Sequence, residues 1–142
     1  MEAEGCTAEV CGAGMFHSIY GTEKFQGFKL PVESRADVRT LIGARAEKLA
    51  YLNCAMDRAS FDQAAIGDGE TYHFVDRITG EPVELPRADF DDLCRVHLYD
   101  WLEQAPRSRY GWGYRRPGYR RLAERVNALP AYERVFAGEP TA

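Results

Sequence analysis

One long amphipathic segment, residues 89–104, constrains the fold of this chain more than any other stretch. Apolar and aromatic side chains recur in it at spacings of three and four, the period of one face of a helix. These side chains are Phe90, Leu93, Cys94, His97 and Trp101. Pro86 precedes the segment and Pro106 ends it, so the sequence predicts one helix with a buried face.

The remaining segments predict further helices and a single hairpin. We expect helices at residues 8–18, after Ser34, at 44–65 and at 119–129, and a short turn at 132–136. Between them, the alternating residues 72–85 with the Thr79–Gly80 turn predict a β-hairpin. With 142 residues, the chain suits one compact domain. The expected fold class is therefore mainly α, a single domain over residues 1–142 with one inserted hairpin.

Composition excludes several classes of function. The net charge of −4 and the pI near 5.4 make nucleic acid an unfavourable partner for the surface as a whole. No apolar run approaches the ~20 residues that cross a bilayer, and the start of the chain lacks a signal-peptide pattern, so we expect no membrane contact and a cytoplasmic location. The four cysteines show no metal-type spacing and are expected to be reduced thiols.

Asp100 raises the first question about chemistry. It lies three residues after His97, on or beside the buried face of the long predicted helix. A charged carboxylate in that position is costly unless it is paired, hydrogen-bonded or bound to a metal. Two interpretations remain open: a polar site, or an aspartate at the edge of the stripe that reaches an arginine or a backbone group.

His17 raises a similar question, because it follows the small-residue segment at residues 8–16 and precedes several polar side chains. It is either a packed core histidine or a group used for metal binding or proton transfer. Asp57 lies four residues after Asn53, on the same predicted helix face. The two side chains either line a polar crevice or belong to an ordinary row of exposed polar residues. Together His17, Asp57 and Asp100 would supply one nitrogen and two carboxylates, a set that suits iron, manganese or zinc.

An arginine-rich stretch at residues 107–121 offers a competing site. Its arginines, among them Arg115 and Arg116, alternate with tyrosines and a tryptophan. Such a mixture clamps anionic groups and stacks on rings, although it also occurs in loops whose arginines simply pair with nearby acids. Binding of a small anionic substrate by this stretch is an intermediate possibility. Nucleic-acid binding ranks last because the chain is acidic.

Three segments carry a resemblance to known proteins: AGMFHSIYGTEKF, AEKLAYLNCAMDR and HLYDWLEQ. Over roughly residues 5–104 they resemble an uncharacterised bacterial domain family with an FHSIYGT signature. That family is distantly similar to the HD superfamily of helical, metal-dependent phosphohydrolases, which has oxygenase relatives. The resemblance implies an HD-like bundle in which His17 and Asp100 bind the metal. Ser18 stands where the superfamily has an aspartate, and the upstream histidine helix of the superfamily is missing.

These observations lead to one hypothesis and one alternative. The hypothesis is a metal-assisted, hydrolase-like enzyme for a small, anionic or phosphorylated molecule, with catalytic residues His17, Asp57 and Asp100 and a divalent iron, manganese or zinc ion at His17 and Asp100. The expected substrate-binding residues are Ser18, Tyr20, Thr22, Arg115 and Arg116. The alternative is a non-catalytic helical module that binds a ligand or partner and has lost its metal. Because the missing helix would uncover the alanine–glycine face of the first helix, we also expect a homodimer.

Overall fold

The computed structural model describes residues 1–141. Within this range the protein is mainly helical, with seven α-helices and one two-stranded antiparallel hairpin. The α-helices are α1 (Ala8–Met15), α2 (Arg35–Ile42), α3 (Ala44–Ala55), α4 (Arg58–Ala65), α5 (Arg87–Gln104), α6 (Arg116–Arg125) and α7 (Leu129–Phe136). The strands are β1 (Thr71–Val75) and β2 (Pro82–Pro86), and short 3-10 turns cover Glu2–Glu4, Val32–Ser34 and Ala105–Arg107. In the described part of the chain, no helix has both the length and the apolar character that crossing a bilayer requires.

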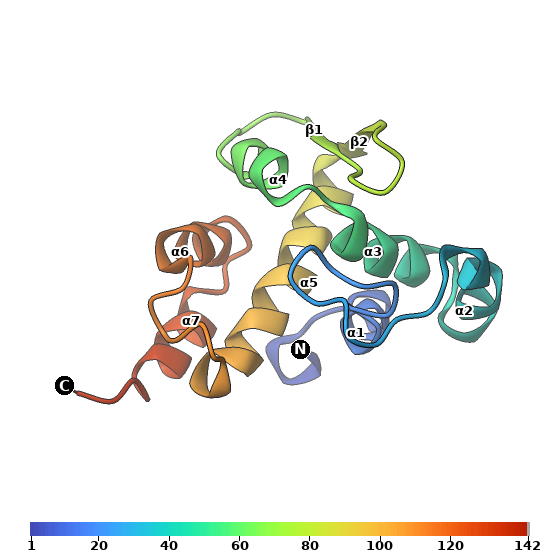
Figure 1. The fold of residues 1–142 in the computed structure, drawn as a ribbon. Coiled ribbons are helices and arrows are strands. Elements are labelled where there is room, and N and C mark those ends of the chain that lie inside the picture. The colour runs from blue at the N-terminus through green and yellow to red at the C-terminus, as the bar shows by residue number, and fades with distance from the viewer. Residues whose placement is uncertain (142) are drawn as a thin grey trace.

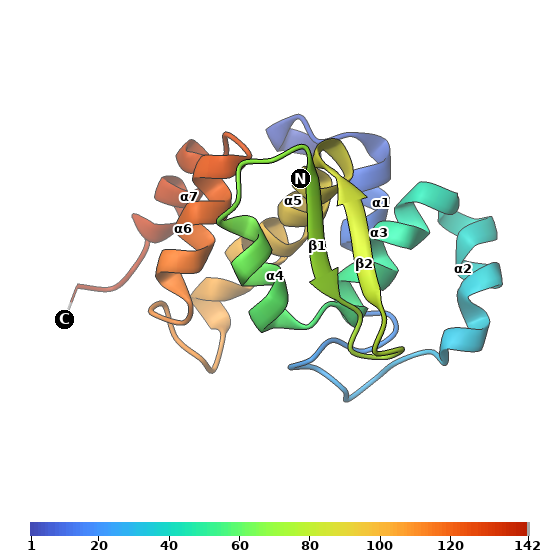
Figure 2. The same cartoon turned by 90° about the horizontal axis from the view of Figure 1, so that it is seen from above.

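Helix α5 runs through the middle of the molecule, and the other elements surround it (Figure 1). Helices α1, α2 and α3 lie on one side, α6 and α7 on the other, and α4 with the hairpin covers the N-terminal end of α5 (Figures 1 and 2). The stripe predicted from the sequence is confirmed, because all five of its side chains are buried. This arrangement places the C-terminal half of α5, with Asp100, between the two groups of helices.

The expected single helix over residues 44–65 is wrong, because the chain breaks between α3 and α4. Met56 and Asp57 leave the helical conformation, and the backbone N–H of Asp57 donates to the carbonyl of Val75 at the end of β1 (2.8 Å). The Asp57 carboxylate then accepts from the backbone N–H of Ser60 (2.9 Å), an N-cap that starts α4. The hairpin therefore takes over the hydrogen bonding that a continuous helix would have used.

The hairpin forms where the sequence predicts it and buries one of its faces. Tyr72 pairs with Leu85 in the register, and both are buried together with Phe74. The Tyr72 ring stacks on Phe90 of α5 at 4.4 Å between centroids, which fixes the hairpin on that helix. His73 points to the opposite face and is exposed, as expected from its register.

Helix α1 begins as expected, with the Thr7 hydroxyl accepting from the backbone N–H of Val10 (3.3 Å), but it ends at Met15 rather than Ser18. Its small-residue face is covered within the same chain: a Cβ added at Gly12 would lie 3.5 Å from the Ala46 Cβ of α3. This contact removes the reason for which a second copy was expected, and the homodimer stays a prediction.

The C-terminal region differs from the expected single helix over residues 119–129. Helix α6 starts three residues earlier and stops at Arg125, and a complete further helix, α7, replaces the expected short turn. Arg115 has φ 51° and ψ 23°, the left-handed conformation, directly before α6. Such a backbone reversal in a non-glycine residue is uncommon.

Candidate functional site

A cavity of about 460 Å³ lies between the α1–α2 connection, the C-terminal half of α5 and the α5–α6 loop. The connection contributes His17, Ser18, Thr22, Lys24 and Phe25; α5 contributes Asp100, Trp101 and Gln104; and the later residues contribute Ser108, Arg109, Tyr110, Tyr114 and Tyr119. Arg58, the first residue of α4, completes the lining. The cavity is large enough for a small molecule and too small for a folded partner.

His17 and Asp100 meet at this cavity. The Nε2 of His17 lies 2.8 Å from Oδ1 of Asp100, and its Nδ1 donates to the carbonyl of Gly14 at 2.8 Å. Both ring nitrogens thus face hydrogen-bond acceptors, and only the doubly protonated imidazolium satisfies two acceptors at once. The structure therefore favours an ion pair of protonated His17 with ionised Asp100.

The environment of His17 acts on its pKa in both directions. Burial of the ring lowers the pKa, whereas the hydrogen bond and the charge of Asp100, and the Gly14 carbonyl, raise it by more. The net pKa of His17 lies above its usual value of 6.5. Near neutral pH, the Asp100 carboxylate thus stabilises the protonated form of His17, which burial of the ring disfavours.

The backbone around His17 is held by the end of α3. Asn53 donates from Nδ2 to the His17 carbonyl (2.7 Å), and the Cys54 thiol donates to the same oxygen (3.2 Å). Arg77 also donates to the carbonyls of Gly21 and Cys54, at 2.8 and 2.7 Å, and so attaches the start of the following loop. These contacts explain why the short turn after α1 can position an imidazole: its backbone is fixed by buried donors from another helix.

Two cations of the cavity, Lys24 and Arg58, were missed by the sequence analysis, whereas Arg109 belongs to the arginine-rich stretch that it identified. Lys24, Arg58 and Arg109 line it, together with the His17 imidazolium, against one carboxylate from Asp100. The walls between them are aromatic, with Phe25, Trp101, Tyr110, Tyr114 and Tyr119. Only the arginine–aromatic alternation around residues 107–121 signalled part of this set in advance. The charge balance favours a small anionic molecule with an apolar or ring-bearing part.

Two residues expected in the site lie outside the cavity. Asp57 caps α4 and does not line it. Tyr20 is buried beneath the connection and donates from its hydroxyl to Glu47 (2.8 Å). Ser18 and Thr22 do line the cavity, although the Thr22 hydroxyl already accepts from the backbone N–H of Phe25 (3.0 Å).

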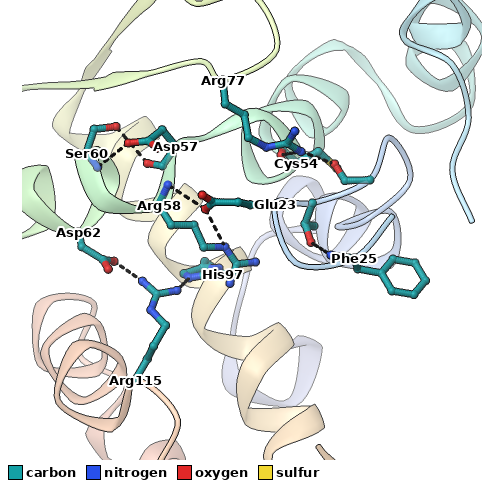
Figure 3. A network of polar contacts seen from close by, with 12 residues as sticks. Glu23, Phe25, Cys54, Asp57, Arg58, Ser60, Asp62, Arg77, His97 and Arg115 are labelled. Carbon is teal, nitrogen blue, oxygen red and sulfur yellow. Dashed lines mark hydrogen bonds and ion pairs between the residues drawn. The ribbon is translucent and has the colours of Figure 1, made fainter. Parts of the chain in front are cut away.

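The two arginines expected to bind an anion are engaged elsewhere. Arg115 pairs with Asp62 of α4 and lies 3.2 Å from Nε2 of His97. Arg116 pairs with Glu139 at 2.5 Å. Neither lines the cavity, and the Arg115 side chain extends toward Asp62 of α4 instead (Figure 3).

The structure offers few donors for a metal ion. Among the described residues, no group of three or more histidine, cysteine, aspartate or glutamate side chains is placed to hold one. His17 and Asp100 provide two, which is an incomplete donor set by the standard of protein metal sites with three or four ligands. The divalent ion expected at these residues stays a prediction.

Replacing Asp100 by Asn is expected to lower the pKa of His17, because the substitution removes the charge that opposes the effect of burial. The pKa is measured by following the imidazole Hε1 and Cε1 resonances of His17 by NMR across pH 5–9. Asp37→Asn, which removes an exposed carboxylate of α2, is the control and should leave the pKa of His17 unchanged.

The same pair gives a pH dependence of stability with a defined sign. Because the folded-state pKa of His17 is raised, its contribution is fully present below the unfolded-state value of about 6.5 and is lost as pH rises through the folded pKa. The difference in free energy of unfolding between wild type and Asp100→Asn should therefore shrink from pH 6 to pH 9. An unchanged His17 pKa in the variant would contradict the ion pair.

Comparison with known proteins gives one partial match. No curated protein and no solved structure matches the chain. The match is to the model of a family described as a domain of unknown function (DUF6817), and it covers residues 1–58. This segment contains His17 and the first residue of α4 but not Asp100, and the similarity to the HD superfamily stays a prediction. In its first 58 residues, the chain is thus similar to an uncharacterised domain family, and this matched segment of the chain includes His17, one of the two members of the ion pair at the cavity.

Proposed function

We propose that the protein is a hydrolase-like enzyme that binds a small anionic molecule in the cavity and activates water with the His17–Asp100 pair. One observation carries the proposal. Oδ1 of Asp100 is held by His17 at 2.8 Å and by the amide of Gln104, whereas Oδ2 has no hydrogen-bond partner in the described part of the chain. A carboxylate fixed on one oxygen and free on the other, in a cavity, is suited to take a proton.

Each side chain has a definite role in this proposal. Oδ2 of Asp100 accepts a proton from a water molecule as the water oxygen attacks the ester carbon or phosphorus of the substrate. The bond from that atom to the ester oxygen then breaks, and the alcohol leaves with the proton that Asp100 returns to it. His17 keeps the carboxylate in place and compensates its charge, which makes His17 a positioning residue in this scheme. The cations of the cavity hold the anionic group, and the aromatic walls limit the access of bulk water.

The Asp100→Asn variant tests the proposal. Wild type is first screened against small anionic esters: phosphate esters such as p-nitrophenyl phosphate, and carboxylate esters that also carry a free carboxylate. For an ester that is hydrolysed, we expect kcat to fall by about a hundredfold or more in the variant, since general-base catalysis contributes ~10²–10⁴. Thermal unfolding of both proteins shows whether the variant keeps its fold.

Asp37→Asn is the matched control and should retain wild-type kcat, because Asp37 does not line the cavity. Equal kcat in Asp100→Asn and wild type would refute the proposal. Binding of anions without hydrolysis of any ester would refute it as well and would favour the non-catalytic binding module.

Elemental analysis of the same preparations tests the divalent metal. Iron, manganese or zinc at one equivalent in wild type, lost in both His17→Ala and Asp100→Ala, would show that the two side chains act as ligands. The water would then be activated by the ion instead of by Asp100 alone.

A further inference from the structure

Arg58 is the most unusual cation of the molecule. Its side chain is only 15% exposed and lines the cavity, yet its guanidinium donates no hydrogen bond to any residue in the part of the chain that the structure describes. A guanidinium carries five N–H donors, and in Arg58 no acceptor of the described chain takes up any of them. Arg58 thus brings unused donors to the lining of the cavity.

The other arginines show how exceptional this is. Arg39 and Arg121 are the only two others in residues 1–141 whose side chains donate no hydrogen bond, and both are exposed. The remaining arginines all donate to acceptors; Arg115, next to Arg58 in Figure 3, pairs with Asp62. Three of these each leave a single buried nitrogen unpaired but donate from another: Arg77, Arg116 and Arg125. Among the described residues, Arg58 is thus the one mostly buried arginine whose side chain donates no hydrogen bond at all.

The nearest carboxylate to Arg58 belongs to Glu23, in the loop between α1 and α2. Its Oε2 accepts from the backbone N–H of Arg58 at 3.2 Å but lies 3.9 Å from the guanidinium Nε (Figure 3). The Glu23 side chain is 35% exposed, and the next two residues, Lys24 and Phe25, line the cavity. The ion pair is long and partly solvated, so it is weak.

We propose that Arg58 binds the anionic group of the ligand, a carboxylate or phosphate, and that Glu23 gives up its ion pair with Arg58 when the ligand enters. The position of the ligand rests on the proposed function. The planar guanidinium can donate two parallel hydrogen bonds to such an oxyanion, which Glu23 does not reach in this geometry. Lys24 and Arg109 add positive charge at the same cavity.

In this proposal, Glu23 competes with the ligand for the guanidinium of Arg58. Its carboxylate partly neutralises Arg58 before the ligand arrives, so Glu23→Gln should bind anions more tightly than wild type. The expected gain is about twofold to fivefold, the range that an exposed ion pair is worth. Arg58→Met should weaken binding by about tenfold or more, because the charge and the two-pronged donor are both lost.

The experiment is an NMR titration of ¹⁵N-arginine-labelled protein with inorganic phosphate and, separately, with benzoate. The Nε–Hε resonance of Arg58, identified by its absence in Arg58→Lys, should shift and saturate with at least one of the two probes. Saturation with phosphate alone identifies a phosphate ligand, and saturation with benzoate alone identifies a carboxylate. Arg121→Met and Glu33→Gln, both at exposed positions, are the controls and should bind as wild type does.

Three outcomes would overturn the proposal: an Arg58 resonance that neither probe shifts, wild-type affinity in a folded Arg58→Met, or no gain in Glu23→Gln. The failure of this proposal and the failure of the proposed function give different results. Repeating the titration with Asp100→Asn separates binding at Arg58 from hydrolysis, because this variant lacks the proposed general base. Binding at Arg58 in a protein that hydrolyses no ester refutes only the proposed function. Hydrolysis with unchanged KM in Arg58→Met refutes only the role of Arg58.

Discussion

Replacing Phe61 by Ala is expected to lower the free energy of unfolding by about 3–5 kcal/mol, the cost of removing a buried aromatic ring from a core. Phe61 of α4 is 0% exposed. Its ring centroid lies 5.4 Å from Phe90, 5.4 Å from the ring of His97 and 6.1 Å from Phe74. It thereby joins α4 to both α5 and the hairpin, and its removal leaves a cavity in a close-packed core.

Urea denaturation followed by far-UV circular dichroism measures the effect of this substitution. Phe28→Ala is the matched control, because Phe28 is 77% exposed and its loss should change the free energy of unfolding by no more than about 0.5 kcal/mol. A loss below about 1 kcal/mol in Phe61→Ala would mean that α4 is not packed against α5 as described.

Replacing Glu47 by Ala is expected to cost about 3 kcal/mol, since breaking a buried ion pair leaves its partner without compensation. Glu47 of α3 is 0% exposed and accepts from Arg35 at 2.6 and 2.9 Å and from the hydroxyl of Tyr20 at 2.8 Å. Burial raises the pKa of Glu47, but the bonds from Arg35 and Tyr20 lower it by more, so the carboxyl is ionised in the fold.

The exposed Glu33→Ala is the control for this substitution, measured by the same urea denaturation. Because the pKa of Glu47 is lowered, its contribution is present above the unfolded-state pKa of about 4.3 and disappears as the pH falls through the folded pKa. The two proteins, wild type and Glu47→Ala, should therefore converge in stability under acidic conditions. A constant difference down to pH 2 would show that packing, rather than charge, accounts for the loss.

Local patterns were sufficient to predict the helices with a clear apolar stripe and the hairpin. They were insufficient at Met56 and Asp57, where helical spacing continues in the sequence although the chain turns. The break depends on a hydrogen bond to Val75, a residue distant in sequence, and no local propensity encodes that contact. The end of α1 was misplaced for a related reason, since Asn53 and Cys54 of α3 hold the His17 carbonyl outside the helix.

The candidate site was predicted in part. His17 and Asp100 stood out because each is a polar residue beside an apolar face, and the structure places them in contact. Arg58 carried no such signal, because its environment is created by the loop around Glu23 and by the α5–α6 loop. Arg115 carried a misleading one: its sequence context is that of a flexible basic loop, whereas its side chain pairs with Asp62.

The hydrogen bond between Val75 and Asp57 connects the hairpin to the cavity. The bond lies at the turn end of the hairpin, because Val75 is the last residue of β1 before the exposed turn around Gly80, and it reaches the residue directly before Arg58. A fluorophore attached at the turn would leave the cavity free while sitting on an element that is mechanically connected to its main cation. Labelling at Thr79 would thus give a sensor that responds to any anion that enters the cavity and separates Glu23 from Arg58, whatever its chemical identity.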